Sequence, residues 1–149
     1  MKIGSISENK DFEKRIAITP EIAKKYISLD LEVLLVENYG AHLGYNDDEY
    51  KKEGVNIIKD EKEVLDKSDV IVQLALLADD KASLVKENKT LIGVLNPSSN
   101  KDKIESLAKK KIIVNNQLIL FYLGMMFLQK VTDIVFNIHF AKIFIYFFV

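Results

Sequence analysis

The sequence predicts an α/β fold, an open, doubly wound and mainly parallel sheet of the Rossmann or flavodoxin type. Two observations support this prediction. Short apolar runs alternate with segments of helical spacing from residue 1 to residue 114, which is typical of βαβ units with right-handed crossovers. The run Val33-Leu34-Leu35-Val36 is apolar throughout, as expected of a parallel strand that is covered on both faces.

The predicted elements follow one another at regular spacing. Strands are predicted at residues 2–7, 32–37, 55–58, 69–74, 90–95 and 112–114. Helices are predicted at residues 19–29, 47–53, 60–67, 79–87 and 101–109. Because ligands bind at the carboxyl ends of the strands in such sheets, candidate site segments are residues 7–15, 38–42, 74–78 and 96–99.

Three local signals mark helix ends. Thr19 followed by Pro20 predicts a helix start, since the hydroxyl caps free N–H groups and proline fits the first helical position. Asp47 and Asp48 are predicted to cap the next helix, and Gly54 to end it.

Composition excludes several functional classes. The chain has 149 residues, a formal net charge of −1 and no cysteine. The lack of cysteine excludes disulfides, thiolate metal sites and cysteine nucleophiles. The balanced charge argues against general nucleic-acid binding. The opening apolar stretch is too short for a signal peptide, so a cytoplasmic location is expected.

The composition changes abruptly near residue 115. Beyond residue 114 only Lys130, Asp133 and Lys142 are charged, and before it Phe12 is the only phenylalanine. We therefore expect a domain at residues 1–114 and a divergent apolar tail at residues 115–149.

Three interpretations of the tail remain open. It is a membrane segment, a replacement strand and helix that dock on the sheet, or an out-of-frame or truncated reading of the gene. The apolar run 118–128 is shorter than the roughly 20 residues that span a bilayer. The third interpretation is favoured because Ile, Phe, Asn, Lys and Tyr dominate an AT-rich sequence read out of frame.

Few residues suggest chemistry. Gly40 and Gly44 have the wrong spacing for a dinucleotide-binding loop, and His42 lacks metal-ligand partners at suitable spacing, so no metal site is predicted. Arg15 is the only arginine. It either holds a carboxylate or phosphate with its two-pronged guanidinium or pins a loop to the sheet.

Two segments resemble the alanine dehydrogenase / NAD(P) transhydrogenase alpha-subunit family. Arg15-Ile16-Ala17-Ile18-Thr19-Pro20 matches its Arg-hydrophobic-Ala-x-Thr-Pro element, and Ser68-Asp69-Val70-Ile71-Val72-Gln73 matches a strand that begins Ala/Ser-Asp. The resemblance extends from residue 1 to about residue 114. It implies the N-terminal side of a cleft that, in the intact protein, binds NAD(H) against a Rossmann domain.

Two positions separate the branches of this family. Alanine dehydrogenases carry a substrate-holding lysine where this chain has Ala75, and a catalytic histidine where it has Asn96. Asparagine cannot exchange a proton near neutral pH. The resemblance therefore implies the alpha subunit of the proton-translocating NAD(P) transhydrogenase. That enzyme transfers hydride from NADH to NADP⁺ and couples the transfer to proton translocation.

The family's cofactor-contacting Arg-Ala-Gln segment and Gly-rich Rossmann fingerprint are absent from the sequence. We therefore expect a fragment that is inactive alone. No catalytic residue is assigned, and NAD(H) is expected only of the intact enzyme. Arg15, Gln73 and Asn96, all at strand ends, are the candidate cofactor-cleft residues.

The resemblance also implies partners, namely the NADP-binding and membrane components of a transhydrogenase and a second copy in a homodimer. Through them the domain would lie beside the inner membrane. Two alternatives remain open: a fragment of an alanine-dehydrogenase-like oxidoreductase of amino acids, or a non-catalytic α/β binding or assembly module.

Overall fold

The computed structural model describes residues 1–116. Over this range the strands are β1 (Lys2–Ser5), β2 (Glu32–Val36), β3 (Asn56–Ile58), β4 (Val70–Val72), β5 (Thr90–Gly93) and β6 (Ile113–Asn116). The helices are α1 (Pro20–Ile27), α2 (Asp47–Lys52), α3 (Glu61–Lys67), α4 (Asp79–Leu84) and α5 (Lys101–Lys109), with a 3₁₀ turn η1 (Ala41–Leu43). The predicted tail beyond Asn116 lies outside the described residues.

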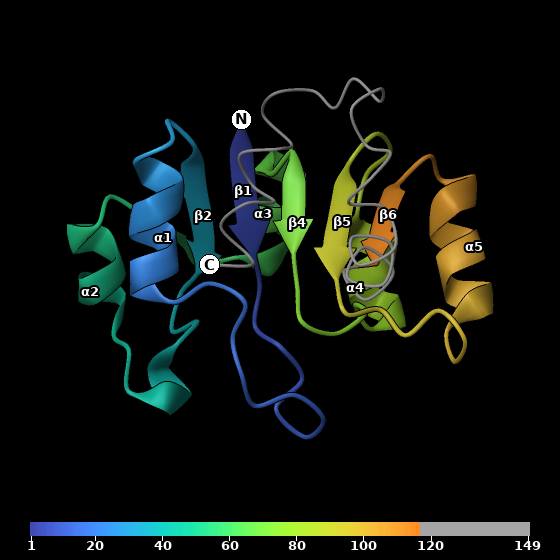
Figure 1. Ribbon diagram of the computed structural model, residues 1–149, viewed down its shortest axis with the longest axis horizontal. Helices are drawn as coiled ribbons and strands as arrows, with labels where there is room; N and C mark the ends of the chain where they lie inside the picture. Colours follow the sequence, from blue (N-terminus) through green and yellow to red (C-terminus); the bar gives the residue numbers. More distant parts are fainter. Residues whose placement is uncertain (117–149) are drawn as a thin grey trace, which may run out of the picture.

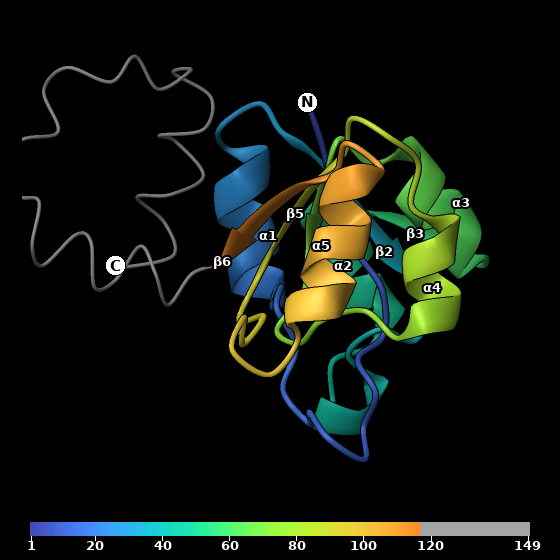
Figure 2. The ribbon, with the colours of Figure 1, turned by 90° about the vertical axis from the view of Figure 1, so that its right-hand side faces the viewer.

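The strands form one parallel sheet in the order β3-β2-β1-β4-β5-β6 (Figure 1). This is the Rossmann order, so the predicted doubly wound α/β fold is confirmed and the flavodoxin order is not adopted. Figure 2 shows α1 on one face of the sheet and α3 and α4 on the other. The chain reverses direction across the sheet between β1 and β4, where ligands bind in such folds.

The core lies where the apolar runs predicted it. Val33, Leu35 and Ile71 have no exposed surface, as expected for central strands covered on both faces. The central strands also approach each other's loops closely. A Cβ on Gly93 would lie 2.2 Å from the Gln73 carbonyl oxygen, so only glycine fits at the end of β5.

The helix starts agree with the sequence in one case and differ in another. Thr19 caps α1 as predicted, and its Oγ1 accepts the Ile22 N–H at 3.3 Å. The predicted aspartate cap of α2 is wrong, because Asn46 is the cap. Asn46 and Glu49 accept each other's backbone N–H groups. Asp47 instead accepts the N–H of Asn38 at 2.9 Å.

Two boundaries also differ from the prediction. Several strands are shorter than their apolar runs, because pairing stops where the chain turns into loops; β4, for example, ends at Val72. In contrast, β6 runs to Asn116, and Gly93 pairs with that residue. The sheet therefore continues two residues past position 114. Within residues 1–116, no helix combines the length and apolar character required to cross a bilayer.

Candidate functional site

The ends of β1 and β4 meet at a buried polar cluster. Ser5 is fully buried, and its Oγ donates to the Val72 carbonyl oxygen at 2.7 Å. The same Oγ lies 2.8 Å from the Tyr39 hydroxyl and 3.4 Å from Gln73 Oε1. Three segments that are distant in sequence therefore meet at the point where the sheet reverses direction.

Gln73 closes this point from the β4 side. Its side-chain amide donates to the Ile6 carbonyl oxygen at 3.2 Å, and only 1% of the residue is exposed. Gln73 therefore lies at the predicted strand end. Its amide joins the two central segments and is not presented to solvent.

Tyr39 connects the cluster to the segment before α1. Its hydroxyl oxygen accepts the N–H groups of Ala17 at 3.0 Å and Ile18 at 3.3 Å. Burial raises the pKa of Tyr39 to about 12, so the phenol stays neutral at physiological pH. Tyr50 donates to the Ile18 carbonyl oxygen at 2.9 Å, and the two tyrosines together fix this backbone.

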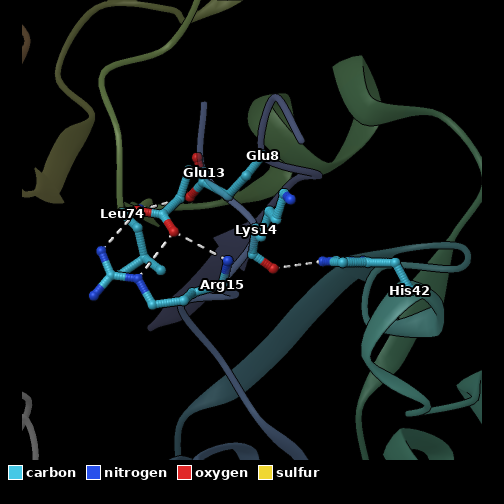
Figure 3. A network of polar contacts seen from close by, with 6 residues as sticks. All are labelled: Glu8, Glu13, Lys14, Arg15, His42 and Leu74. Atoms are coloured by element: carbon cyan, nitrogen blue, oxygen red, sulfur yellow. Dashed lines mark hydrogen bonds and ion pairs between the residues drawn. The ribbon is translucent and has the colours of Figure 1, made fainter. Parts of the chain in front are cut away.

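Arg15 lies just before that fixed backbone and is paired within its own loop (Figure 3). Its Nε and Nη2 donate to the two carboxylate oxygens of Glu13 at 2.9 and 2.7 Å. The guanidinium holds the pKa of Glu13 down at about 2. The Arg15 side chain is 76% exposed, whereas that of Glu13 is 16% exposed. A ligand anion that approaches from solvent would therefore find Arg15 accessible but already paired.

His42 supports the same loop from η1. Its Nε2 lies 2.8 Å from the Lys14 carbonyl oxygen, within hydrogen-bond distance, as Figure 3 shows. In residues 1–116 no three His, Cys, Asp or Glu side chains gather in a way that would hold a metal ion.

Glu8 is the site residue that the sequence reasoning missed. Its Oε1 accepts the Leu74 N–H at 2.6 Å, which joins the loop after β1 to the loop after β4 (Figure 3). Burial raises the pKa of its carboxyl above the ordinary value. The available signal was an acidic residue directly after a buried strand, at the ligand-binding edge.

Asn96 follows β5 and serves a turn. Its backbone φ is +44°, in the left-handed region that asparagine tolerates better than most residues. Its carbonyl oxygen accepts the N–H groups of Ser99 and Asn100 at 3.0 and 3.1 Å. No hydrogen bond or ion pair joins Arg15, Gln73 and Asn96 to one another in the described portion of the chain. The three candidates therefore share one edge of the sheet without forming a cluster.

The described edge does not by itself form a dinucleotide site. In the Rossmann fold the turn after the first strand carries the glycines that approach the pyrophosphate, and here Ile6-Ser7-Glu8-Asn9 holds none. A groove of about 360 Å³ between α4 and α5 adjoins the edge. Its lining mixes apolar side chains such as Leu77 and Leu107 with both acids and lysines.

Comparisons with known proteins agree on one family. A family model described as "Alanine dehydrogenase/PNT, N-terminal domain" matches residues 4–116. The first of the polypeptides that make up the NAD(P) transhydrogenase alpha subunit of Rhodospirillum rubrum is 32% identical over 117 residues, which cover 75% of this chain and 30% of that protein. Alanine dehydrogenase 1 of Staphylococcus aureus is 27% identical over 107 residues, covering 72% and 28%.

A solved structure shows the same fold. The crystal structure of transhydrogenase from Sinorhizobium meliloti superposes with a TM-score of 0.71 at 22% identity, covering 76% of this chain and 34% of that one. The chain thus spans about a third of the length of the relatives that it matches.

Proposed function

The chain belongs to the alanine dehydrogenase/PNT N-terminal domain family, and from this premise we propose that it is the N-terminal portion of an NAD(P) transhydrogenase alpha subunit. In the intact enzyme it forms one wall of the cleft that binds NAD(H). Hydride passes from NADH to NADP⁺, coupled to proton translocation. Its partners are the rest of the alpha subunit, the NADP-binding and membrane components, and a second copy. Through them it lies on the cytoplasmic side of the inner membrane.

One observation carries the choice between the two branches of the family. The edge of the sheet lacks the groups that hold and turn over an amino acid. Ala75 offers only a methyl group where the resemblance implies a lysine, and Asn96 sits in a turn where it implies a histidine. Arg15 remains, and Glu13 already occupies its guanidinium. Hydride transfer between two nicotinamide rings requires none of these amino-acid contacts.

The candidate residues receive specific proposed roles. Arg15 lies on the cofactor side of the cleft, where its exposed guanidinium faces an anionic ligand. Gln73 shapes the cleft from below by tying the ends of β1 and β4 together. Asn96 shapes the turn after β5.

A chimera tests the proposed branch. Residues 1–114 would replace the matching N-terminal segment of the Rhodospirillum rubrum relative, and in a second chimera that of a Staphylococcus aureus alanine dehydrogenase. We expect NADH-dependent reduction of NADP⁺ from the first chimera, with its partner components present, and no alanine-dependent reduction of NAD⁺ from the second. Alanine turnover by the second chimera would contradict the proposal. The same exchange with Arg15→Gln measures the contribution of the arginine.

We also propose that the family domain comprises residues 1–114 and that residues 115–149 do not belong to it. The abrupt change in composition supports this division. The nucleotide sequence around codon 115 tests it. A shifted frame that restores the Arg-Ala-Gln segment is the expected result. A conserved frame in close relatives, with the same apolar residues, would contradict the proposal.

A further inference from the structure

The segment that follows β4 has few polar groups of its own. Residues 73–78 read Gln-Leu-Ala-Leu-Leu-Ala, and the amide of Gln73 is already used beneath the sheet edge. Ala78 precedes α4 without any side-chain cap. The backbone N–H groups of this segment therefore require an acceptor from elsewhere in the chain.

Glu8 supplies that acceptor from the loop after β1. Its carboxylate receives the Leu74 N–H at 2.6 Å and also the N–H of Ala75. The distance to Leu74 is in the short range typical of a charged acceptor. Within residues 1–116, no lysine or arginine nitrogen lies within 4 Å of this carboxylate. Its partners are thus backbone groups, and its ionic environment is set by more distant charges.

We infer that Glu8 is a positioning residue, which holds the Leu74–Ala75 backbone against the loop after β1 and so fixes the cleft wall at the point where the sheet reverses. Its importance for cofactor binding rests on the proposed function, whereas the contact itself does not. The carboxylate form binds both N–H groups strongly. Protonation removes the charge that strengthens these two hydrogen bonds and loosens the wall.

The groups that face Glu8 determine where this change occurs. Burial raises the pKa of its carboxyl, and the negative charge of Glu13 raises it further. The two backbone N–H groups and Lys81 of α4 act in the opposite direction. Arg15 and the neutral Tyr39 complete the surroundings. Because burial dominates, the wall loosens at a less acidic pH than an ordinary glutamate would give.

Amide NMR on the full 149-residue chain tests the inference without any cofactor. In the unaltered protein, the Leu74 and Ala75 amide shifts should titrate with a midpoint above 4.5, the ordinary value for glutamate. Glu8→Gln keeps an oxygen acceptor, so it should retain slow amide exchange but lose this titration. Glu8→Ala should accelerate exchange at both amides about tenfold. Glu21→Ala, on the exposed surface of α1, should change neither amide.

The two proposals fail in different ways. Shifts that titrate identically in the unaltered protein and in Glu8→Gln, or that do not titrate in either, would overturn the role of Glu8. This comparison suffices even where Glu8→Ala does not fold. If the amides behave as expected while the transhydrogenase chimera is inactive, the proposed function fails and the role of Glu8 stands.

Discussion

The hydroxyl of Tyr39 holds the backbone that carries Arg15, and Tyr39→Phe removes it without changing the ring. That oxygen accepts two N–H groups, from Ala17 and Ile18, and both donors are buried. Phenylalanine leaves both donors without a partner. Ser5 keeps its bond to the Val72 carbonyl oxygen, so the loss falls mainly on the segment before α1.

The expected cost follows from these two donors. A buried N–H group left without an acceptor costs about 1–3 kcal/mol. Partial relaxation of the loop lowers the sum, so we expect Tyr39→Phe to reduce the free energy of unfolding by about 2–4 kcal/mol. This is a large share of the roughly 5–15 kcal/mol that stabilises a typical domain.

Tyr26→Phe is the matched control. Tyr26 is also buried, but its hydroxyl has no hydrogen-bond partner in the described structure. Its removal relieves an unsatisfied polar group, so the free energy of unfolding should stay the same or rise by up to about 1 kcal/mol. Urea unfolding of the three proteins measures the difference. Equal stability of Tyr39→Phe and Tyr26→Phe would refute the reasoning.

Three further perturbations test the fold and its electrostatics. Gly93→Ala drives a Cβ into the Gln73 carbonyl oxygen and should destabilise the domain by about 3 kcal/mol, the upper end for overpacking, as measured by urea unfolding; Gly44→Ala meets no atom within 4 Å and should cost only about 1–2 kcal/mol for its φ of +89°. Asn46→Ala removes the cap of α2 and should lower the thermal midpoint through a loss of about 1 kcal/mol, whereas Asp48→Ala should have little effect. The pKa of Glu13 lies below its unfolded value, so its pair with the arginine stabilises the folded state above pH 4.5 and is lost as the pH falls towards 2. Because that arginine is mostly exposed, Glu13→Gln should cost less than about 1 kcal/mol at about pH 6 and nothing near pH 2, and a cost that is independent of pH would contradict the pairing.

The local signals of the sequence were sufficient for the alternation of elements. Thr19 and Pro20 act within one turn of the helix that they begin, and the apolar run in β2 reflects burial on both faces. These signals depend on neighbours in sequence, so they can be read without the fold. The cap of α2 was predicted one residue late, because Asn46 and Asp47 are both good caps and only the backbone geometry selects between them.

The order of residues along the chain was enough to predict a parallel α/β sheet, a candidate site at the strand ends, and a resemblance to a family with an NAD(H) cleft. The strand order emerged only from the folded molecule, because the spacing left it open between two types. Folding also buries Gln73 and brings Glu8 to Leu74 across 66 positions of the chain. Neither Glu8 nor Tyr39 is distinctive in its local sequence. Their roles arise only when folding places them beside backbone N–H groups that have no closer acceptor.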